Sequence, residues 1–342
     1  MRAGLLLSFG VALTSLALGA GSPAENVTAF RRFLADKVAT LEKQNAAACA
    51  GTDGWLFLTS ELRFLSRDRF WGDAAAKVAH SRRPESADPL PAILDFHRQL
   101  HERGIELILV PVPPKAAIFP EKIAPQIALD PTASAPALTE FYAKLREQGI
   151  DVLDLSALFA RNRESPRGSV YCRTDSHWSG IGCALAGEAI AKEIRAKVAA
   201  LPAAREYARE WKVVSISGDL AGLVPPAQKP GLEQIAVRQL ASAIKPEPNS
   251  PVLLLGDSHT LVFHDFLAER AGLLDQLTAE LGFVPDLIGT RGSGATPVRV
   301  SLFRRTRSDP QFLAKKKVVV WCFAAREFTE ADQGWVVQPI AK

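Results

Sequence analysis

The sequence predicts an α/β domain in which a mostly parallel sheet is covered by helices on both faces. Short runs of branched apolar residues alternate with longer amphipathic stretches along the chain. Strands that are apolar on both faces and alternate with helices are typical of a parallel sheet buried between two helical layers. No internal repeat is visible in the chain. We therefore expect a single three-layer α/β/α domain, since such folds often reach this length as one unit.

The expected strands are the short runs rich in Val, Ile and Leu, and the expected helices are the stretches with apolar residues at three-to-four spacing. Two of the helices begin near a proline, which suits the first turn of a helix. The strands are residues 105–112, 151–155, 251–255, 284–288 and 318–323, and the helices are residues 91–103, 136–148, 180–199 and 260–281. The segment 245–250 is expected to be a surface loop.

The first residues have the layout of an export signal. Arg2 is followed by an uncharged, mostly apolar stretch that ends in small residues before Pro23. We expect residues 1–24 to form a signal peptide, cleaved after Gly19 or Ala24, or an uncleaved anchor in the inner membrane, because about 20 apolar residues span a bilayer. Residues 25–48 are expected to form an N-terminal helix, and residues 49–342 the α/β domain. The expected location is the periplasm.

Charge and cysteine content exclude some kinds of partner. The chain has 41 Lys and Arg against 37 Asp and Glu, a formal net charge of +4, and this mixture gives no sign of a nucleic-acid partner.

None of the cysteines, Cys49, Cys172, Cys183 and Cys322, belongs to a CxxC pair, so no zinc site is expected. In an exported protein these cysteines predict one or more disulfides, with the pairing left open. We expect no cofactor and no metal.

Ser258 is a candidate nucleophile. It lies in the segment Leu-Gly-Asp-Ser-His, where an apolar strand pattern passes into a helical one. In an open α/β sheet, sites form at the carboxyl ends of the strands. Free backbone N–H groups at the start of a helix can also stabilise an oxyanion. The alternative is that Asp257 and Ser258 only cap the helix.

A second segment, Arg-Thr-Asp-Ser-His-Trp at residues 173–178, supplies a base and a carboxylate. Residues two apart in an extended chain point to the same side, about 7 Å apart, so Asp175 can orient the imidazole of His177. The alternative is that Asp175 or Ser179 caps the following helix while His177 merely packs. Together the two segments provide the nucleophile, base and orienting carboxylate that serine-dependent acyl transfer needs.

Weaker site candidates surround this predicted triad. The turn containing Gly292 and Gly294 could donate a backbone N–H group to an oxyanion or could be only a turn. Lys115 could line the cleft or be an exposed lysine, and Trp178 could stack on a sugar ring or pack in the core. Arg173, the first residue of the segment that contains His177, is a further oxyanion or substrate candidate.

At these residues the chain resembles the SGNH hydrolase-like acyltransferases typified by the alginate O-acetyltransferases AlgJ and AlgX. The markers of that family are an Asp-x-His-Trp element followed later in the chain by a Gly-Asp-Ser element, and this chain has both in that order. The resemblance extends in order over roughly residues 50–330. Its other matching segments are residues 51–58, 110–115, 118–120, 292–296, 319–321 and 325–327.

The resemblance implies an SGNH hydrolase-like, flavodoxin-like fold with Ser258 as nucleophile, His177 as base and Asp175 as its partner. It also implies a polysaccharide acceptor such as alginate, a membrane-bound O-acyltransferase that donates acetyl groups, and other exopolysaccharide export proteins as partners. A polysaccharide O-acetylesterase with the same triad and a non-catalytic polysaccharide-binding or export scaffold remain alternatives. Two departures from the family are His259, where an aromatic residue usually follows the serine, and the expected lack of a C-terminal carbohydrate-binding module.

Overall fold

The centre of the protein is a five-stranded parallel sheet, seen in a computed structural model that describes residues 22–341. The strands lie in the order β10–β9–β11–β3–β4, and each neighbouring pair is parallel. Their bounds are β3 (Glu106–Val112), β4 (Asp151–Val152), β9 (Val252–Gly256), β10 (Asp286–Gly289) and β11 (Val318–Ala324). All five expected strands are present, although β4 is shorter than expected and β10 begins two residues late.

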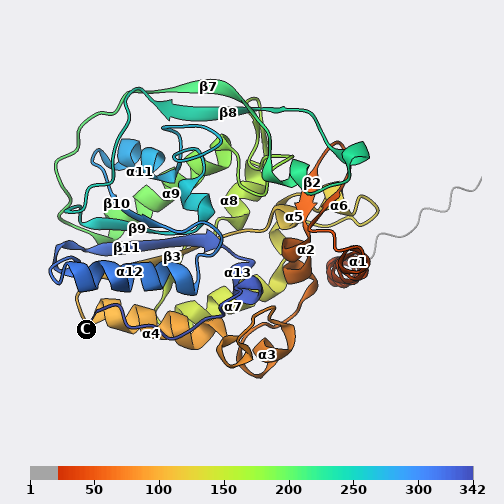
Figure 1. The fold of residues 1–342 in the computed structure, drawn as a ribbon, viewed down its shortest axis with the longest axis horizontal. Helices are drawn as coiled ribbons and strands as arrows, with labels where there is room; N and C mark the ends of the chain where they lie inside the picture. The colour runs from red at the N-terminus through yellow and green to blue at the C-terminus, as the bar shows by residue number, and fades with distance from the viewer. Residues whose placement is uncertain (1–21, 342) are drawn as a thin grey trace, which may run out of the picture.

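Helices cover both faces of this sheet, which confirms the expected three layers. Figure 1 shows α4 (Pro89–His101) and α12 (Thr296–Ser308) along one face, and α9 (Gly180–Lys197) and α11 (Leu273–Leu281) over the other. All residues of β9 and β11 are buried between the helical layers. Apolar strands of this kind fit a parallel sheet that has no solvent-facing side.

The expected helix at residues 260–281 is wrong, because the chain breaks there into two helices. α10 (Ser258–Leu261) is a single turn, and α11 begins only at Leu273. Between them Phe263, Leu267 and Arg270 have left-handed backbone conformations, with φ of 65°, 65° and 59°. A helix cannot pass through such residues, so an apolar spacing that fits a helix forms an irregular loop. The other three expected helices are present, with α7 (Pro136–Glu147) as the third.

A β-hairpin outside the central sheet was not expected from the sequence. Its strands, β7 (Arg209–Ile216) and β8 (Glu233–Leu240), pair antiparallel and lie beyond α9 and α11 in Figure 1. Most of β7 is exposed, and its charged start resembles a surface loop in sequence. The connection between the strands contains two short 3₁₀ turns, Asp219–Gly222 and Pro226–Gln228.

The remaining elements are short. A small hairpin of β1 (Ala48–Ala50) and β2 (Leu56–Leu58) precedes the central sheet, and β5 (Glu164–Ser165) pairs with β6 (Gly168–Ser169). The short helices are α2 (Thr59–Ser66), α3 (Ala75–Val78), α5 (Lys115–Ile118), α6 (Pro120–Ile123), α8 (Ser156–Arg161) and α13 (Glu327–Glu330). The expected loop at residues 245–250 contains no helix or strand.

The N-terminal helix is α1 (Pro23–Lys43), which packs against α2. Ser22 and Glu25 form a capping box at its start, which satisfies free N–H groups of the first turn. The expected signal peptide lies outside the described residues up to position 21, and Ala24, the later cleavage position, lies in the first turn of α1. Among residues 22–341, no helix combines the length and the apolar character that a membrane span requires.

The expected disulfide is absent, since all four cysteines are free and buried. They belong to the buried core, where two of the thiols donate weak hydrogen bonds to backbone carbonyls. Cys172 Sγ lies 3.5 Å from the carbonyl oxygen of Trp178, and Cys183 Sγ lies 3.7 Å from that of Ala271. Burial raises the pKa of all four thiols, so they behave as small apolar side chains.

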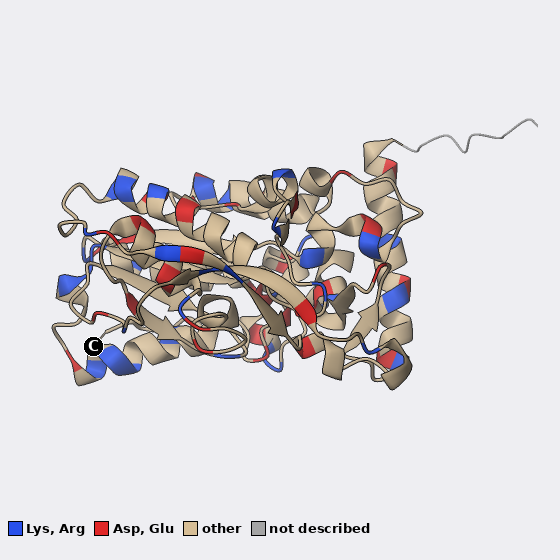
Figure 2. Cartoon of the chain, turned by 90° about the horizontal axis from the view of Figure 1, so that it is seen from above, with Lys and Arg blue, Asp and Glu red and all other residues tan. Residues whose placement is uncertain are grey.

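Basic and acidic side chains are mixed over the surface. Figure 2 shows Lys and Arg interspersed with Asp and Glu over the helices, strands and loops. This distribution agrees with the small net charge of +4.

Candidate active site

Ser258 lies where β9 leaves the sheet. A side chain at Gly256 would place its Cβ 2.0 Å from the carbonyl oxygen of Cys322 on β11, so the turn requires glycine there. Asp257 then holds the turn, because its Oδ1 accepts the N–H of His259 at 2.9 Å and its Oδ2 accepts the N–H of Ala324 at 2.8 Å. Ser258 is therefore presented at the carboxyl edge of the sheet, half-buried.

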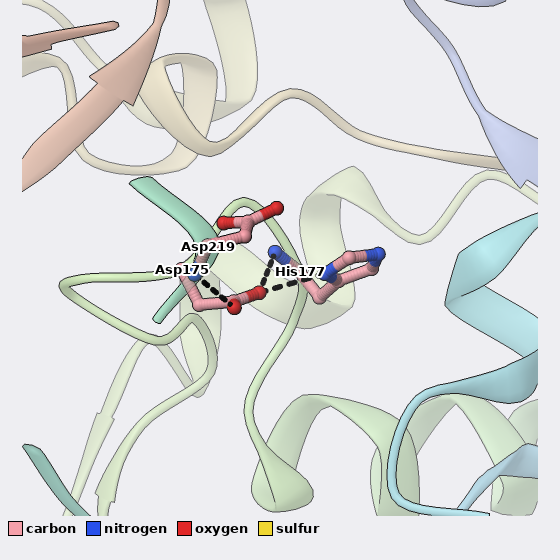
Figure 3. Close-up of side chains that lie close together, drawn as sticks. All are labelled: Asp175, His177 and Asp219. Atoms are coloured by element: carbon pink, nitrogen blue, oxygen red, sulfur yellow. Dashed lines mark hydrogen bonds and ion pairs between the residues drawn. The ribbon is translucent and has the colours of Figure 1, made fainter. Parts of the chain in front are cut away.

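The structure brings Asp175, His177 and Ser258 together. His177 Nε2 lies 2.8 Å from Ser258 Oγ, and His177 Nδ1 lies 2.6 Å from Asp175 Oδ1. Figure 3 shows the carboxylate of Asp175 directed at both the ring and the backbone N–H of His177. An ionised carboxylate only accepts hydrogen bonds, so Nδ1 carries the proton and Nε2 faces the serine hydroxyl as an acceptor.

Asp175 remains ionised although it is buried. Burial alone would raise its pKa, but the hydrogen bond and charge of His177, together with the N–H of Asp219, lower it to about 2. The Asp219 N–H donates to Asp175 Oδ2 at 2.8 Å. The carboxylate can therefore orient the imidazole and stabilise an imidazolium without taking up the proton itself.

Asp219 supports the same segment from the hairpin connection. Its Oδ1 accepts the N–H of Ser176 at 2.7 Å, and its Oδ2 accepts the Ser176 hydroxyl at 2.6 Å. One ligand atom each of Asp175, His177 and Asp219 lies within 4.8 Å of the others, a spacing that could suit a metal ion. However, both oxygens of Asp175 already accept N–H groups. These contacts favour a hydrogen-bonded support over a set of metal ligands.

His259 packs directly behind the candidate base. Its ring lies 4.8 Å from that of His177 and 5.3 Å from that of Trp178, and the side chain is only 2% exposed. Burial lowers its pKa to about 4, against the opposing effect of Asp257. His259 is thus neutral near pH 7, and its uncharged ring packs where relatives usually have an aromatic residue after the serine.

Trp178 does not line the site. It is 0% exposed, and its ring packs edge-on against Phe159 and His259. The expectation that it stacks on a sugar ring is wrong, because no face of the indole reaches solvent. The alternative of core packing applies.

Lys115 is neither exposed nor in the cleft. It is 1% exposed, and its Nζ donates to the carbonyl oxygens of Cys172, Arg173 and Asp175 at 3.0, 3.3 and 2.8 Å. Burial lowers its pKa, although Glu61 and other acidic groups oppose that change. Its position beneath the backbone of the Asp175 segment excludes direct contact with substrate.

The glycine turn lies beside the nucleophile. A Cβ on Gly294 would lie 2.4 Å from Phe323 Cβ and 3.2 Å from Asp257 Cβ, so only glycine fits. Its carbonyl oxygen accepts the Trp321 indole N–H at 2.7 Å, and within residues 22–341 its own N–H has no hydrogen-bond partner. Gly292, two residues earlier, has φ of 100° and is exposed. Gly294 is thus the better placed of the two to donate to an oxyanion.

Arg173 faces a different cavity. It forms an ion pair with Glu233 at 3.7 Å, and both residues line a cavity of about 340 Å³ that also contacts Tyr171 and Arg167. No residue of the Asp175, His177 and Ser258 group lines that cavity. A direct substrate role for Arg173 at Ser258 therefore finds no support.

Residues that the sequence did not single out complete the site. The ring of Phe266 packs edge-on against His177 at 5.7 Å, and the guanidinium of Arg291 lies 4.4 Å over the Phe266 ring. Arg291 is exposed and follows the end of β10. The sequence could have indicated Arg291, since it is a charged residue just past a parallel strand, and sites form at that edge of the sheet.

An α/β/α domain that carries a hydrogen-bonded Ser, His and Asp at the carboxyl edge of its sheet has the architecture of the SGNH hydrolase-like class. The match to known proteins defines the family more narrowly. The model of a family described as "SGNH hydrolase-like domain, acetyltransferase AlgX" matches residues 48–325, and the chain belongs to this family. This finding confirms the resemblance to the alginate O-acetyltransferases.

Curated relatives carry the same assignment. The "Probable alginate O-acetylase AlgJ" of Pseudomonas aeruginosa is 30% identical over 177 residues, a match that covers 51% of this chain and 40% of that protein. The protein of the same name from Pseudomonas putida is 24% identical over 312 residues, covering 84% and 73% of the two chains. The first match therefore spans less than half the length of the P. aeruginosa protein.

Solved structures agree on the fold. The O-acetyltransferase domain of P. putida AlgJ superimposes with a TM-score of 0.62 at 22% identity, covering 83% of this chain and 92% of that one. P. aeruginosa AlgX gives a TM-score of 0.60 at 19% identity, covering 85% and 63%. The SGNH hydrolase-like fold expected from the sequence is thus confirmed.

Proposed function

We propose that this protein is a serine-dependent O-acetyltransferase that transfers acetyl groups to hydroxyls of an exported polysaccharide. The observation that carries the proposal is the continuous hydrogen-bonded line from Asp175 through His177 to Ser258, with donor–acceptor distances of 2.6 and 2.8 Å. Such a line activates a serine that is otherwise a weak nucleophile. Membership of the acetyltransferase family supports the choice of acyl group.

The first half-reaction places the acetyl group on the protein. Ser258 Oγ attacks the carbonyl carbon of the acetyl donor while its proton passes to His177 Nε2. The tetrahedral intermediate collapses, the imidazolium returns the proton to the departing group, and an acetyl-serine remains. The unpartnered N–H of Gly294 and the N–H of Ser258 are the candidate donors to the transient oxyanion.

The second half-reaction delivers the acetyl group. A sugar hydroxyl gives its proton to His177 Nε2 and attacks the acetyl-serine, and collapse of the second intermediate returns the proton to Ser258 Oγ. Water in place of the sugar would make the protein an esterase, with the same residues in the same roles. The balance between the two outcomes depends on how well the site holds a sugar hydroxyl against the acyl group.

The acceptor side is formed by Phe266 and Arg291. Arg291 stacks on Phe266, which packs on His177, so its positive charge is held close to the candidate base. Within residues 22–341 the Arg291 guanidinium stacks on Phe266 and has no carboxylate partner. An acidic sugar, such as the uronate residues of alginate, would supply one.

The supply of acetyl groups is part of the proposal. We infer that a membrane-bound O-acyltransferase donates them and that the protein acts in the periplasm beside other export proteins, as the resemblance to the alginate O-acetyltransferases implies. A non-catalytic scaffold would not need an oriented base next to a serine, so the geometry favours catalysis.

Mass spectrometry tests the proposal directly. The purified protein is exposed to an activated acetyl ester, with and without acidic oligosaccharides. We expect a transient mass increase of one acetyl group on the peptide containing Ser258, and acetylated sugar when the acceptor is present. Free acetate alone, over a broad panel of acceptors, would replace the transferase proposal with the esterase.

A further inference from the structure

We propose that Lys115 and Glu233 are positioning residues that hold the backbone of residues 172–177, here called the histidine loop, from opposite sides. The inference rests on the proposed function, because it assigns these two residues an effect on the orientation of His177. Neither residue contacts Ser258 or the space in front of it. Each is buried and ionisable, and each directs its whole hydrogen-bonding capacity at the histidine loop.

Lys115 supports the carbonyl side of the loop. Three carbonyl oxygens, those of Cys172, Arg173 and Asp175, converge on its Nζ at 3.0, 3.3 and 2.8 Å. Carbonyl dipoles that point at one place repel one another, and a buried cation with three donors removes that repulsion. The rings of Trp55 and Phe57 lie 5.8 and 5.4 Å from the ammonium group and keep water away. Lys115 thereby fixes the curvature of the loop.

Glu233 supports the amide side of the same loop. Its Oε1 accepts the N–H of Arg173 at 2.8 Å, and its Oε2 accepts both the N–H and the hydroxyl of Thr174 at 2.8 Å. The side chain is 6% exposed, which makes these charge-assisted bonds strong. A cation therefore holds carbonyl groups, and an anion holds amide groups, of the same four residues, 172–175.

The β7–β8 hairpin supplies most of this support. Glu233 opens β8, and the connection from β7 provides Gly218, Asp219 and Leu220. The N–H of Leu220 donates to the carbonyl of Thr174 at 3.2 Å, and a Cβ on Gly218 would lie 2.1 Å from that same oxygen. The hairpin connection is thus packed tightly against the histidine loop.

The geometry of the loop decides the geometry of the base. Asp175 and His177 are two residues apart on it, and their side chains meet at 2.6 Å. A displacement of the reacting groups by about 1 Å can cost on the order of 10²-fold in rate. Loss of either anchor should therefore act on the chemical step and leave acceptor binding almost unchanged.

The test compares Lys115→Met and Glu233→Gln with matched controls elsewhere in the core. Lys316 is a second buried lysine whose Nζ donates to the carbonyls of Pro248 and Ser250 and to Asp286, at the opposite edge of the sheet. Lys316→Met and Asp286→Asn therefore remove a similar anchor away from the site. Turnover of an acetyl ester is measured on protein shown to be folded by circular dichroism.

We expect kcat to fall by on the order of 10²-fold in Lys115→Met with little change in KM. The loss in Glu233→Gln should be smaller, since its amide oxygen still accepts one N–H. The controls should lower stability without lowering kcat. A second readout is the far-downfield proton resonance of an imidazole N–H bonded to a carboxylate, which should shift or broaden in both site variants.

Equal losses of kcat in Lys115→Met and Lys316→Met would overturn the inference, as would an unchanged downfield resonance in both site variants. If Lys115→Met does not fold, Glu233→Gln decides the question alone. A wild-type protein that shows the resonance but transfers no acetyl group would refute the proposed function, while the resonance in the variants would still test the positioning role.

Discussion

The hydroxyl of Ser293 donates a hydrogen bond to the carboxyl group of Glu327, which links the glycine turn to the start of α13, just after β11. Glu327 is 3% exposed, and burial raises its pKa to about 7, with opposing effects from Ser293 and Arg326 and a reinforcing effect from Asp257. The folded protein thus holds a proton on Glu327 over a pH range in which the unfolded chain has lost it.

The first prediction follows from this proton. Between the unfolded pKa, near 4.5, and the folded pKa, about 7, the native state binds more protons, so the contribution of Glu327 to stability is lost as the pH rises. The unfolding free energy of the wild type should therefore fall between pH 5 and pH 8. In Glu327→Gln this fall should be smaller by on the order of 1–3 kcal/mol. Urea denaturation at both pH values measures it. The same pH difference in variant and wild type would contradict the shifted pKa.

The second prediction concerns the triad. Ser258→Ala and His177→Ala should lower turnover of an acetyl ester by at least about 10³-fold, and Asp175→Asn by about as much, because the asparagine favours the wrong imidazole tautomer. Ser258→Ala should melt close to the wild type, since only a half-buried hydroxyl is removed. A folded Ser258→Ala protein with wild-type turnover would end the assignment.

The third prediction concerns His259, whose pKa is lowered to about 4 by burial. Its unfolded pKa is near 6.5, so the unfolded state gains a proton first as the pH falls, and stability is lost between about pH 6.5 and pH 4. His259→Phe should lose less stability than the wild type between pH 7 and pH 5, measured by urea denaturation. An equal or greater acid-side loss in the variant would show that another group causes it.

The fourth prediction concerns the charge of the acceptor. Arg291→Ala should raise KM for acidic oligosaccharides several-fold, leave KM for neutral ones unchanged and leave hydrolysis of a small ester intact. Arg291→Lys should restore part of the preference, since it keeps the charge without the planar stacking group. Arg167 is the matched control, because its guanidinium also stacks on a ring, that of Trp211 at 5.3 Å, away from Ser258. Equal effects of Arg167→Ala and Arg291→Ala would refute a specific role.

The fifth prediction concerns Trp178. Because the ring is fully buried beside Phe159, Trp178→Ala should cost about 3–5 kcal/mol of unfolding free energy through the cavity it leaves. The ratio of sugar ester to free acetate should stay at the wild-type value in the surviving folded protein. A selective loss of the sugar product would restore a substrate role for this residue.

The sequence predicts the central sheet well and the periphery poorly, for a physical reason. Strands such as β9 and β11 are buried on both sides, so their composition alone identifies them. β7 is exposed along most of its length, and its residues carry no such constraint. The break between α10 and α11 depends on left-handed residues whose side chains give no sign of that conformation.

The candidate site likewise contains residues that the sequence could predict and residues that it could not. Asp175, His177 and Ser258 could be proposed because their chemistry is rare in that spacing and order. The buried state of Lys115 and Trp178 could not, because it depends on contacts with residues distant in the sequence, such as Asp175, 60 positions from Lys115, and His259, which packs against Trp178. Asp219 and Glu233 lie in a stretch without motifs, and only the packing of the hairpin connection brings them to the histidine loop.

The hairpin support also bears on how relatives of this protein should be compared. A related chain could keep the serine, the histidine and the aspartate, fold into the same five-stranded sheet, and still orient its base poorly if the outer hairpin were shortened or replaced. Sorting such chains by the three reacting residues alone would group competent and impaired members together. A glycine and an aspartate at the equivalents of Gly218 and Asp219, with a buried acid facing them from the next strand, would be the better markers of a working acyl-transfer centre.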